Sequence, residues 1–237
     1  MRPVCKGAIP TDANGNDVEY SDYSNARGEL VKRLGEYCSY CEMHLDSSLA
    51  VEHVKPKKPK GETEVIVERE LDWNNFLLAC SNCNSTKGNL DVDLDDYFWP
   101  DRDNTLLAFN YCEGGIIVAS NILDMNLMGK ANATIKLIGL DKNPLNDHTC
   151  SDRRWLNRRE TWDLAIRLKE RLTRNNNEDF RDSIVDLMEA KGYWSIWMTV
   201  FKDDSNMLQR FIQALPGTAQ ECFNEYGALL HRHNGLI

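Results

Sequence analysis

Two cysteine pairs of the form CxxC stand in one chain, and they restrict its fold more than any other feature. The pairs are Cys38 with Cys41 and Cys80 with Cys83, and 38 residues separate them. Each pair places two thiolates close enough to bind one ion, and two such pairs complete a closed tetrahedral zinc site. The separation is longer than in small zinc ribbons. We therefore expect a structural Zn²⁺ site with further structure built between the pairs.

The cysteines have other interpretations that the sequence argues against. A redox CxxC usually stands between a strand and a helix of a thioredoxin-like unit, and no βαβ pattern surrounds either pair. His44 follows Cys41 by three residues, but with four thiolates available we expect it to be a surface or packing residue. The remaining cysteines are scattered, and we expect ordinary buried thiols at Cys5, Cys112, Cys150 and Cys222.

The cellular compartment decides whether the eight cysteines are expected to form disulfides. No apolar run is long enough to span a membrane, and the first residues lack the apolar core of a signal peptide. We therefore expect a cytoplasmic chain with no membrane partner. In that compartment cysteines bind metal or stay reduced more often than they form disulfides.

Local patterns in the first half predict short helices and strands. A helix is expected over residues 25–35, capped by Ser24 or Asn25 and stopped by Gly35. A strand is expected at 49–54, with a further candidate at 65–67. The apolar run at 76–79 leads into the second cysteine pair, and a helix is expected to begin near Cys83.

The chain from Ser151 to its end is expected to be helical. Apolar residues fall on one side of a helical wheel, at Trp155, Trp162, Ala165, Ile166 and Leu172. Arginines fall on the other side, at Arg153, Arg167, Arg171 and Arg174. This arginine face is a candidate contact for a partner or for nucleic acid. The predicted class is thus α+β and mostly helical, with a first domain at 1–113 and a mainly helical region at 114–237 for binding a partner or substrate.

Three motifs stand between and beside the cysteine pairs. They are Val51-Glu52-His53-Val54-Lys55-Pro56, Asp72-Trp73-Asn74-Asn75-Phe76-Leu77-Leu78-Ala79 and Cys83-Asn84-Ser85-Thr86-Lys87-Gly88. Each is weak alone, but together they resemble the HNH endonuclease family. Zinc-containing members of that family show CxxC, an acid–His pair, an Asn before an apolar run, and CxxCNxxKG. The resemblance implies a zinc-stapled ββα-metal nuclease core at residues 38–90.

Phosphodiester hydrolysis explains why such residue types stand together. The attacking water must lose a proton, and neutral imidazole accepts one near physiological pH. A hard divalent cation with oxygen ligands, Mg²⁺ or Mn²⁺, offsets the charge on the phosphate and the leaving oxygen. Glu52 and Asn84 offer one carboxylate and one amide oxygen to such an ion.

The resemblance assigns a role to each position. It implies that His53 is the general base and that Glu52 and Asn84 are the ligands of the catalytic ion. Asp is more common than Glu before the histidine, which leaves the coordination by Glu52 less defined. Asn75 is expected to brace the loop that holds the histidine, with Asn74 as the alternative.

Lysines supply the candidate contacts to substrate. Lys55, Lys57 and Lys58 follow the proposed base directly, where they would position a phosphate backbone without reading its sequence. Lys87 is expected to contact phosphate or to stabilise the start of a helix. A solvated loop is the alternative explanation for the charge run. No aromatic stacking pattern of an RNA-binding module is present, so DNA and RNA both stay open as substrates.

A closer resemblance covers roughly residues 1–140. The sequences at 38–42, 51–57, 73–80 and 96–101 look like the nuclease subunits of Septu-type anti-phage defence systems, and the same nuclease type accompanies some retrons. This resemblance implies an effector nuclease that works beside an ATPase of the ABC/SMC-like type. In the retron-associated form it also implies a reverse transcriptase with its nucleic acid.

The net charge bears on how substrate is held. The chain has 37 acidic and 28 basic side chains, a formal charge of −9, which opposes the binding of a polyanion by bulk electrostatics. We therefore expect a partner to supply most of the binding affinity for nucleic acid.

Two other functions compete with a metal-dependent endonuclease. A catalytically idle zinc adaptor, which binds nucleic acid or the ATPase, has no need for Glu52, His53 and Asn84 together. A transcription factor is disfavoured by the net acidity and by the lack of a helix-turn-helix signal.

Overall fold

The computed structural model describes every residue from 1 to 237, and its fold is α+β and mostly helical, as the sequence predicts. The helices are α1 (Arg27–Leu34), α2 (Val67–Glu70), α3 (Ser81–Lys87), α4 (Thr105–Ala108), α5 (Met125–Ile138), α6 (Arg154–Leu172), α7 (Glu178–Lys191), α8 (Trp194–Val200) and α9 (Ser205–Ala214). The strands are β1 (Ala50–His53), β2 (Phe76–Ala79), β3 (Phe109–Cys112) and β4 (Ile116–Ala119). Short 3-10 turns lie at Tyr23–Ala26, Trp73–Asn75, Leu94–Asp96, Glu113–Gly115 and Gln220–Cys222. No helix is both long and apolar enough to cross a membrane.

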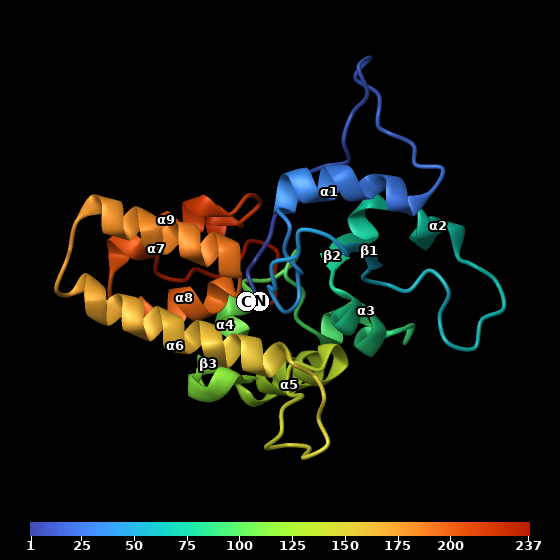
Figure 1. Cartoon of the computed structure of the whole chain (residues 1–237). Coiled ribbons are helices and arrows are strands. Elements are labelled where there is room, and N and C mark those ends of the chain that lie inside the picture. Colours follow the sequence, from blue (N-terminus) through green and yellow to red (C-terminus); the bar gives the residue numbers. More distant parts are fainter.

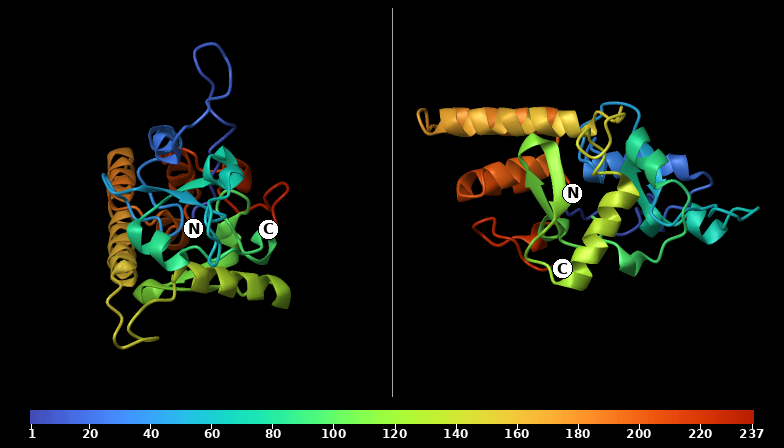
Figure 2. Two further views of the ribbon diagram at one scale, coloured as in Figure 1. Left: turned by 90° about the vertical axis from the view of Figure 1, so that its right-hand side faces the viewer. Right: turned by 90° about the horizontal axis from the view of Figure 1, so that it is seen from below.

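Two regions lie side by side in the molecule (Figure 1). The ββα region, residues 38–90, contains β1, α2, β2 and α3, with α1 beside it. The helical region, residues 154–214, contains α6 to α9. Helix α5 and the β3–β4 hairpin lie below them in this view, the hairpin against α6 and α8, and both termini lie near the centre. Figure 2 gives two further views, in which the N-terminal end of the long helix α6 points toward the ββα region.

The ββα region is built on one antiparallel strand pair. Strand β1 pairs with β2 so that His53 lies opposite Phe76 and Ala50 opposite Ala79. All four residues of β2 are buried, because this continuous apolar run packs on both faces. Helix α3 begins directly after β2, where Cys80 has an extended backbone and its Sγ accepts a hydrogen bond from the N–H of Cys83. It ends at Gly88, whose φ of 60° suits glycine.

The helical region closes around aromatic side chains. Trp194, Trp197, Phe201 and Phe211 are all fully buried. The rings of Trp197 and Phe211 lie 6.0 Å apart and those of Phe201 and Phe211 lie 5.5 Å apart, centroid to centroid. Each indole N–H has a carbonyl acceptor, on Phe211 for Trp194 and on Gly192 for Trp197.

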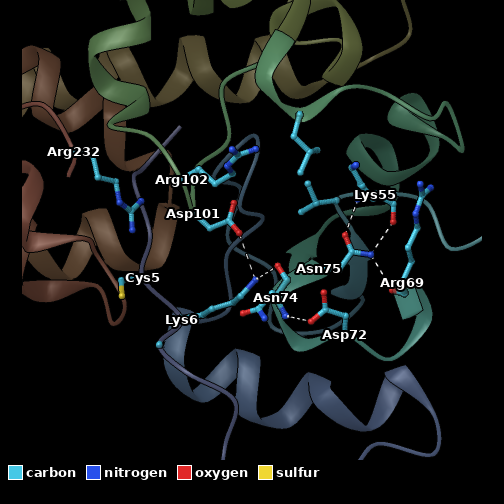
Figure 3. A pocket seen from close by; sticks show the side chains of 13 residues that line it. Cys5, Lys6, Lys55, Arg69, Asp72, Asn74, Asn75, Asp101, Arg102 and Arg232 are labelled. Atoms are coloured by element: carbon cyan, nitrogen blue, oxygen red, sulfur yellow. Dashed lines mark hydrogen bonds and ion pairs between the residues drawn. The ribbon is translucent and has the colours of Figure 1, made fainter. Parts of the chain in front are cut away.

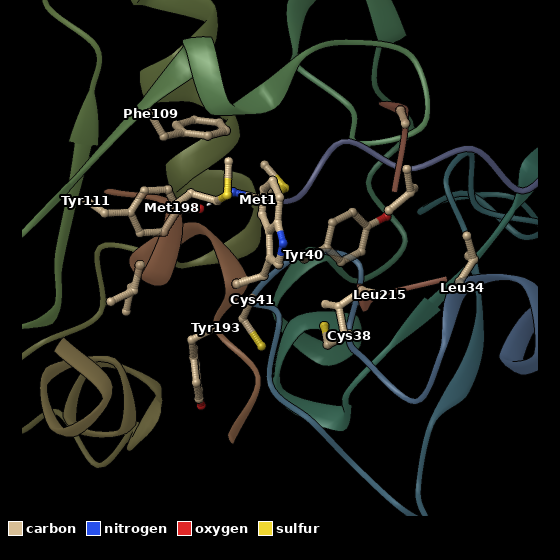
Figure 4. Close-up of a cluster of buried hydrophobic side chains, with 14 of the residues drawn as sticks. Met1, Leu34, Cys38, Tyr40, Cys41, Phe109, Tyr111, Tyr193, Met198 and Leu215 are labelled. Atoms are coloured by element: carbon tan, nitrogen blue, oxygen red, sulfur yellow. Dashed lines mark hydrogen bonds between the residues drawn. The ribbon is translucent and has the colours of Figure 1, made fainter. Parts of the chain in front are cut away.

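One hydrophobic cluster runs through both regions. Figure 4 shows where they meet, with Cys38 and Tyr40 of the ββα region close to Tyr193, Met198 and Leu215 of the C-terminal half. The domain division at residues 113 and 114 stays a prediction. That point lies in the turn that joins β3 to β4, so no linker separates the two parts there.

Several local expectations are corrected by the structure. Helix α1 ends before Gly35, as predicted, but Ser24 and Asn25 do not cap it; Asp22 caps the preceding 3-10 turn instead. Residues 65–67 form no strand, because β1 pairs only with β2, and Val67 begins α2.

The chain is also not helical to its end. Helix α9 stops at Ala214, just before Pro216, which lacks the N–H that a continuing helix needs. The β3–β4 hairpin at 109–119 is a further element that was not predicted from the sequence, and it turns at Gly114 and Gly115, which both have positive φ.

Candidate active site and metal centre

The four predicted cysteines come together in one buried cluster. The Sγ atoms of Cys38, Cys41, Cys80 and Cys83 all lie within 4.8 Å of one another. Those of Cys41 and Cys80 are 3.7 Å apart. A tetrahedral zinc ion with Zn–S bonds of about 2.3 Å needs thiolates roughly 3.8 Å apart, so the cluster fits the ion. His44 stands outside the cluster, near Glu36.

The two CxxC segments, 38–41 and 80–83, are called the first and second knuckle here, and a main-chain contact holds them together. The N–H of Ser39 donates to the carbonyl of Leu78 in β2, which brings the first knuckle to the second. Two single cysteines depart from the prediction of buried thiols, since Cys5 and Cys112 are exposed, while Cys222 is buried. Cys150 is partly exposed, so only Cys222 of the four single cysteines is buried as predicted.

His53 ends β1 and is held from three sides. Its ring lies edge-on to Phe76 of the partner strand, with centroids 5.3 Å apart, and Tyr23 approaches to 4.9 Å. Its Nε2 lies 3.0 Å from the carbonyl oxygen of Glu70. A carbonyl only accepts, so Nε2 carries the proton in this contact and Nδ1 is the unprotonated nitrogen of the neutral ring.

The surroundings of His53 favour the neutral ring. Burial lowers the pKa of the His53 imidazole, the hydrogen bond with Glu70 opposes that change, and the ammonium groups of Lys57 and Lys87 lower the pKa further. A neutral imidazole is the form that accepts a proton, so this environment is compatible with a general base.

Glu52 is buried and paired with a lysine. Its Oε1 lies 2.9 Å from Nζ of Lys87, and the hydroxyl of Tyr40 lies 3.5 Å away. Burial raises the pKa of the Glu52 carboxyl, and the charge of Lys87 opposes that change. The second oxygen, Oε2, has no hydrogen-bond partner within the chain and is not among the fully enclosed polar atoms.

An open cleft of about 430 Å³ joins the predicted catalytic residues. Glu52, His53 and Asn84 all line it, and the side-chain amide of Asn84 makes no hydrogen bond within the chain. The donor set therefore suits a hard divalent cation: one carboxylate oxygen and one amide oxygen at the same opening, with room for waters. Tyr23, Lys57 and Lys58 complete the wall.

Asn75, and not Asn74, braces the backbone after the histidine. Its Oδ1 accepts from the N–H of Lys55, and its Nδ2 donates to the carbonyls of Lys55 and Arg69 (Figure 3). These bonds join the end of β1 to the end of α2 around one buried amide. The Asn74 carbonyl accepts from Lys6, and its side chain makes no such bridge.

The three lysines that follow His53 lie in different surroundings. Lys58 lines the cleft and has no acidic partner, whereas Lys57 is paired with Glu70 at 2.7 Å and its Nζ lies 3.9 Å from the Tyr23 ring centroid. Lys55 points instead into a second cavity of about 610 Å³ beside Asn75 (Figure 3).

Lys87 does not have the surface position that a phosphate contact requires. Its side chain is 1% exposed, and Nζ donates to the carbonyl of His53 while it faces Glu52. Lys87 follows the buried Cys83 by four residues on α3, so both side chains lie on the helix face that packs inward. Lys87 therefore links helix and strand inside the fold.

The comparison with protein families agrees with this geometry. Residues 38–90 match the family model of the HNH endonuclease. The match spans both knuckles, both strands and α3, which is the segment that holds the cluster and the cleft. No curated protein matches the chain. The chain thus contains an HNH endonuclease domain with a four-cysteine site able to bind zinc.

Two contacts at the site were not predicted. Tyr23 lies in the N-terminal segment, which carries no motif, yet its ring packs on His53. Arg154, at the start of α6, places Nη1 2.9 Å from Sγ of Cys83. No spacing rule relates either residue to the motif, because both reach the site only through the tertiary fold.

Proposed function

We propose that this chain is a metal-dependent HNH-type endonuclease that hydrolyses phosphodiester bonds of nucleic acid. One observation carries the proposal: His53, Glu52 and Asn84 line a single open cleft, inside the segment that matches the HNH model and beside four clustered cysteines. An acid, a base and an amide at one opening are the groups that hydrolysis of a phosphate diester uses.

His53 is the proton acceptor in this mechanism. The Glu70 carbonyl holds Nε2–H, Phe76 and Tyr23 hold the ring, and the unprotonated nitrogen takes the proton of the attacking water. Asn75 keeps the following loop in place through its bonds to Lys55. Lys58, which has no acidic partner, orients a phosphate at the mouth of the cleft.

Glu52 and Asn84 are the residues that would hold the divalent cation. Bound there, Mg²⁺ or Mn²⁺ supplies charge stabilisation for the phosphate and the leaving oxygen. Lys87 fixes one carboxylate oxygen of Glu52, which orients the other toward the opening. The four cysteines hold structural zinc and take no part in the reaction.

Replacement of the base tests the proposal. His53→Ala should lower cleavage by about a hundredfold to ten-thousandfold, the usual contribution of a general base, while zinc content stays the same. Cleavage of plasmid DNA and of labelled RNA is measured with Mg²⁺ and with Mn²⁺, alone and with the ATPase partner. His44→Ala is the matched control, because this histidine lies near the first knuckle but outside the cleft. Equal cleavage by His53→Ala and the parent would overturn the assignment.

A zinc adaptor without catalysis is the second candidate, and one observation favours it. The Glu52 carboxylate already has a buried cationic partner in Lys87, as a purely structural carboxylate would. The two candidates differ in metal binding at the cleft. Mn²⁺ bound to the parent but not to Asn84→Ala supports the enzyme, whereas no binding beyond zinc supports the adaptor.

We further propose that the nuclease is the effector of an anti-phage defence complex with an ABC/SMC-like ATPase, in some systems with a retron reverse transcriptase. The resemblance of residues 1–140 to Septu-type nuclease subunits supports this role. The charge of −9 supports a partner that supplies the grip on nucleic acid. The arginine face supports a docking surface on α6, since Arg153, Arg167, Arg171 and Arg174 are all exposed.

The partner proposal has its own test. Size-exclusion chromatography and cleavage assays compare the chain, the ATPase and their mixture. We expect a complex that Arg167→Glu combined with Arg171→Glu weakens, and cleavage that depends on the ATPase. Strong and regulated cleavage by the isolated chain, without complex formation, would contradict the proposal.

A further inference from the structure

Two arginines of α6 are buried beside the cysteine cluster. Arg154 and Arg158 are 1% and 2% exposed, whereas the neighbouring Arg153 and Arg159 are exposed. Burial of a guanidinium is costly unless it finds negative charge or acceptors. Both must therefore have partners inside the protein.

Arg154 makes its contacts at the boundary between the two regions. Its Nη1 lies 2.9 Å from Sγ of Cys83 and also donates to the carbonyl of Ile138, while Nη2 donates to the carbonyl of Gly139. Asp152 accepts from Nε and Nη2 and fixes the guanidinium plane. The guanidinium thus joins α6, the end of α5 and the first turn of α3.

Arg158 lies one turn further along α6 and has no carboxylate partner. It donates to the carbonyls of Gly115 and Leu140, and its Nη1 is buried without any hydrogen-bond partner. An unpaired buried N–H of a cation needs a compensating negative charge nearby. Arg158 follows Arg154 by four residues, so it lies on the same face of α6 as the arginine that contacts Cys83.

The charge of an occupied cluster explains both arginines. Four thiolates around Zn²⁺ carry a formal charge of −2, and this charge is buried with the cysteines. Hydrogen bonds and positive charges around metal ligands tune the affinity for the metal. Arg154 supplies a donor to one thiolate, and Arg158, one turn further along the same face of α6, supplies a second positive charge.

We propose that Arg154 and Arg158 are positioning residues of the zinc site, with Arg154 as hydrogen-bond donor to the Cys83 thiolate and Arg158 as a second counter-charge. Helix α6 is therefore part of the metal centre, and the helical region controls how tightly zinc is held. Cys83 directly precedes Asn84 on α3, so the same contact fixes the helix that borders the cleft. The proposal rests on zinc in the cluster and not on nuclease activity.

Zinc transfer to a chromogenic chelator tests the proposal on the full-length, zinc-loaded chain. Arg154→Gln should release zinc about tenfold faster or more, the range in which partners of metal ligands act. Arg154→Lys keeps the charge and should fall between Gln and the parent, and Arg158→Gln should show a smaller increase. Arg153→Gln is the matched control on the same turn and should release zinc as the parent does. A folded Arg154→Gln chain that releases zinc at the parental rate would overturn the role of Arg154.

A second measurement needs no variant and so survives a failure of Arg154→Gln to fold. In protein substituted with cadmium-113, the Nη protons of Arg154 should show scalar coupling to the metal across the N–H···S bond. Absence of a metal-coupled arginine signal would overturn the proposed bond. Because both readouts follow the metal, a failure here leaves the His53→Ala test unaffected, and an inactive enzyme leaves this one unaffected.

Discussion

The ββα region and the helical region reach stability by different routes. In the ββα region, four cysteines meet around one site, and buried polar groups such as Glu52, Asn75 and Lys87 occupy positions next to β1. In the helical region, four fully buried aromatic rings fill the interior, and the buried charges are arginines on α6 and α7. A small unit built around four clustered cysteines would gain folding free energy from a bound metal ion, whereas an aromatic core supplies hydrophobic burial directly.

This difference has a functional consequence. Catalytic residues must be buried enough to be oriented and still reach an opening, which limits the apolar packing around them. A zinc ion bound by the four cysteines would stabilise the region without filling the cleft. The helical region has no such constraint and therefore serves as the support against which the ββα region packs.

Loss of the metal should have the largest effect. In Cys80→Ser the closed ligand set is broken, and the free energy of zinc binding lost to the ββα region is on the order of 10 kcal/mol. We expect zinc content near zero and loss of hydrogen-exchange protection in β1, β2 and α3, with protection kept in α8 and α9. Simultaneous loss of protection in both regions would show that they unfold as one unit.

Truncation of the aromatic core should lower the stability of the helical region and leave the cysteine cluster intact. Trp197→Ala removes a fully buried indole that contacts Phe201 and Phe211, so we expect the free energy of unfolding to fall by about 3–5 kcal/mol. Chemical denaturation measures the change, and metal analysis follows the cluster. Zinc retained in the folded fraction supports separate sources of stability.

The contact between the regions at Gly192 should have a smaller effect. Gly192 has a φ of 74°, and a Cβ there would lie 2.5 Å from the carbonyl oxygen of Glu42, next to the first knuckle. Gly192→Ala should therefore destabilise the fold by about 1–3 kcal/mol through backbone strain and overpacking. Gly129→Ala is the control, since open space surrounds this glycine of α5 and the change should be neutral or stabilising. Equal melting temperatures for both variants would contradict a close contact at Gly192.

Thiol alkylation should distinguish the cysteines of the cluster from Cys222, which lies outside it, without unfolding the protein. Burial raises the pKa of the Cys222 thiol to about 12, so at pH 8 only about one molecule in ten thousand carries the reactive thiolate. Iodoacetamide should modify the exposed Cys5 and Cys112 in zinc-loaded protein and spare Cys222, with the rate at Cys222 rising tenfold per pH unit. Chelation should then expose the four cluster cysteines and leave Cys222 protected. Mass spectrometry of the digested protein identifies the modified sites, and early labelling of Cys222 would contradict its burial.

The sequence by itself determined the local parts of the site. Two CxxC pairs fix a tetrahedral ligand set, because the ligands within each pair are close in sequence and the metal demands the geometry. The β-branched character of residues 49–54 located β1, whereas the apolar run at 76–79 became strand β2 only by pairing with β1. The order of His53, Asn75 and Asn84 around these elements then followed from the resemblance to HNH nucleases.

Only the tertiary structure decided which side chains share an opening. His53 and Glu52 are adjacent in sequence, yet Lys87 occupies one oxygen of Glu52, and Lys55 points into a different cavity from Lys58. The predicted arginine face of Arg153, Arg167, Arg171 and Arg174 is exposed, but the sequence assigned no role to Arg154 and Arg158, which are buried, with Arg154 on Cys83. The sequence pattern does not show which arginines are buried, because the partner that makes burial favourable comes from a distant segment. For Arg154 this partner is the sulfur of Cys83, 71 residues away.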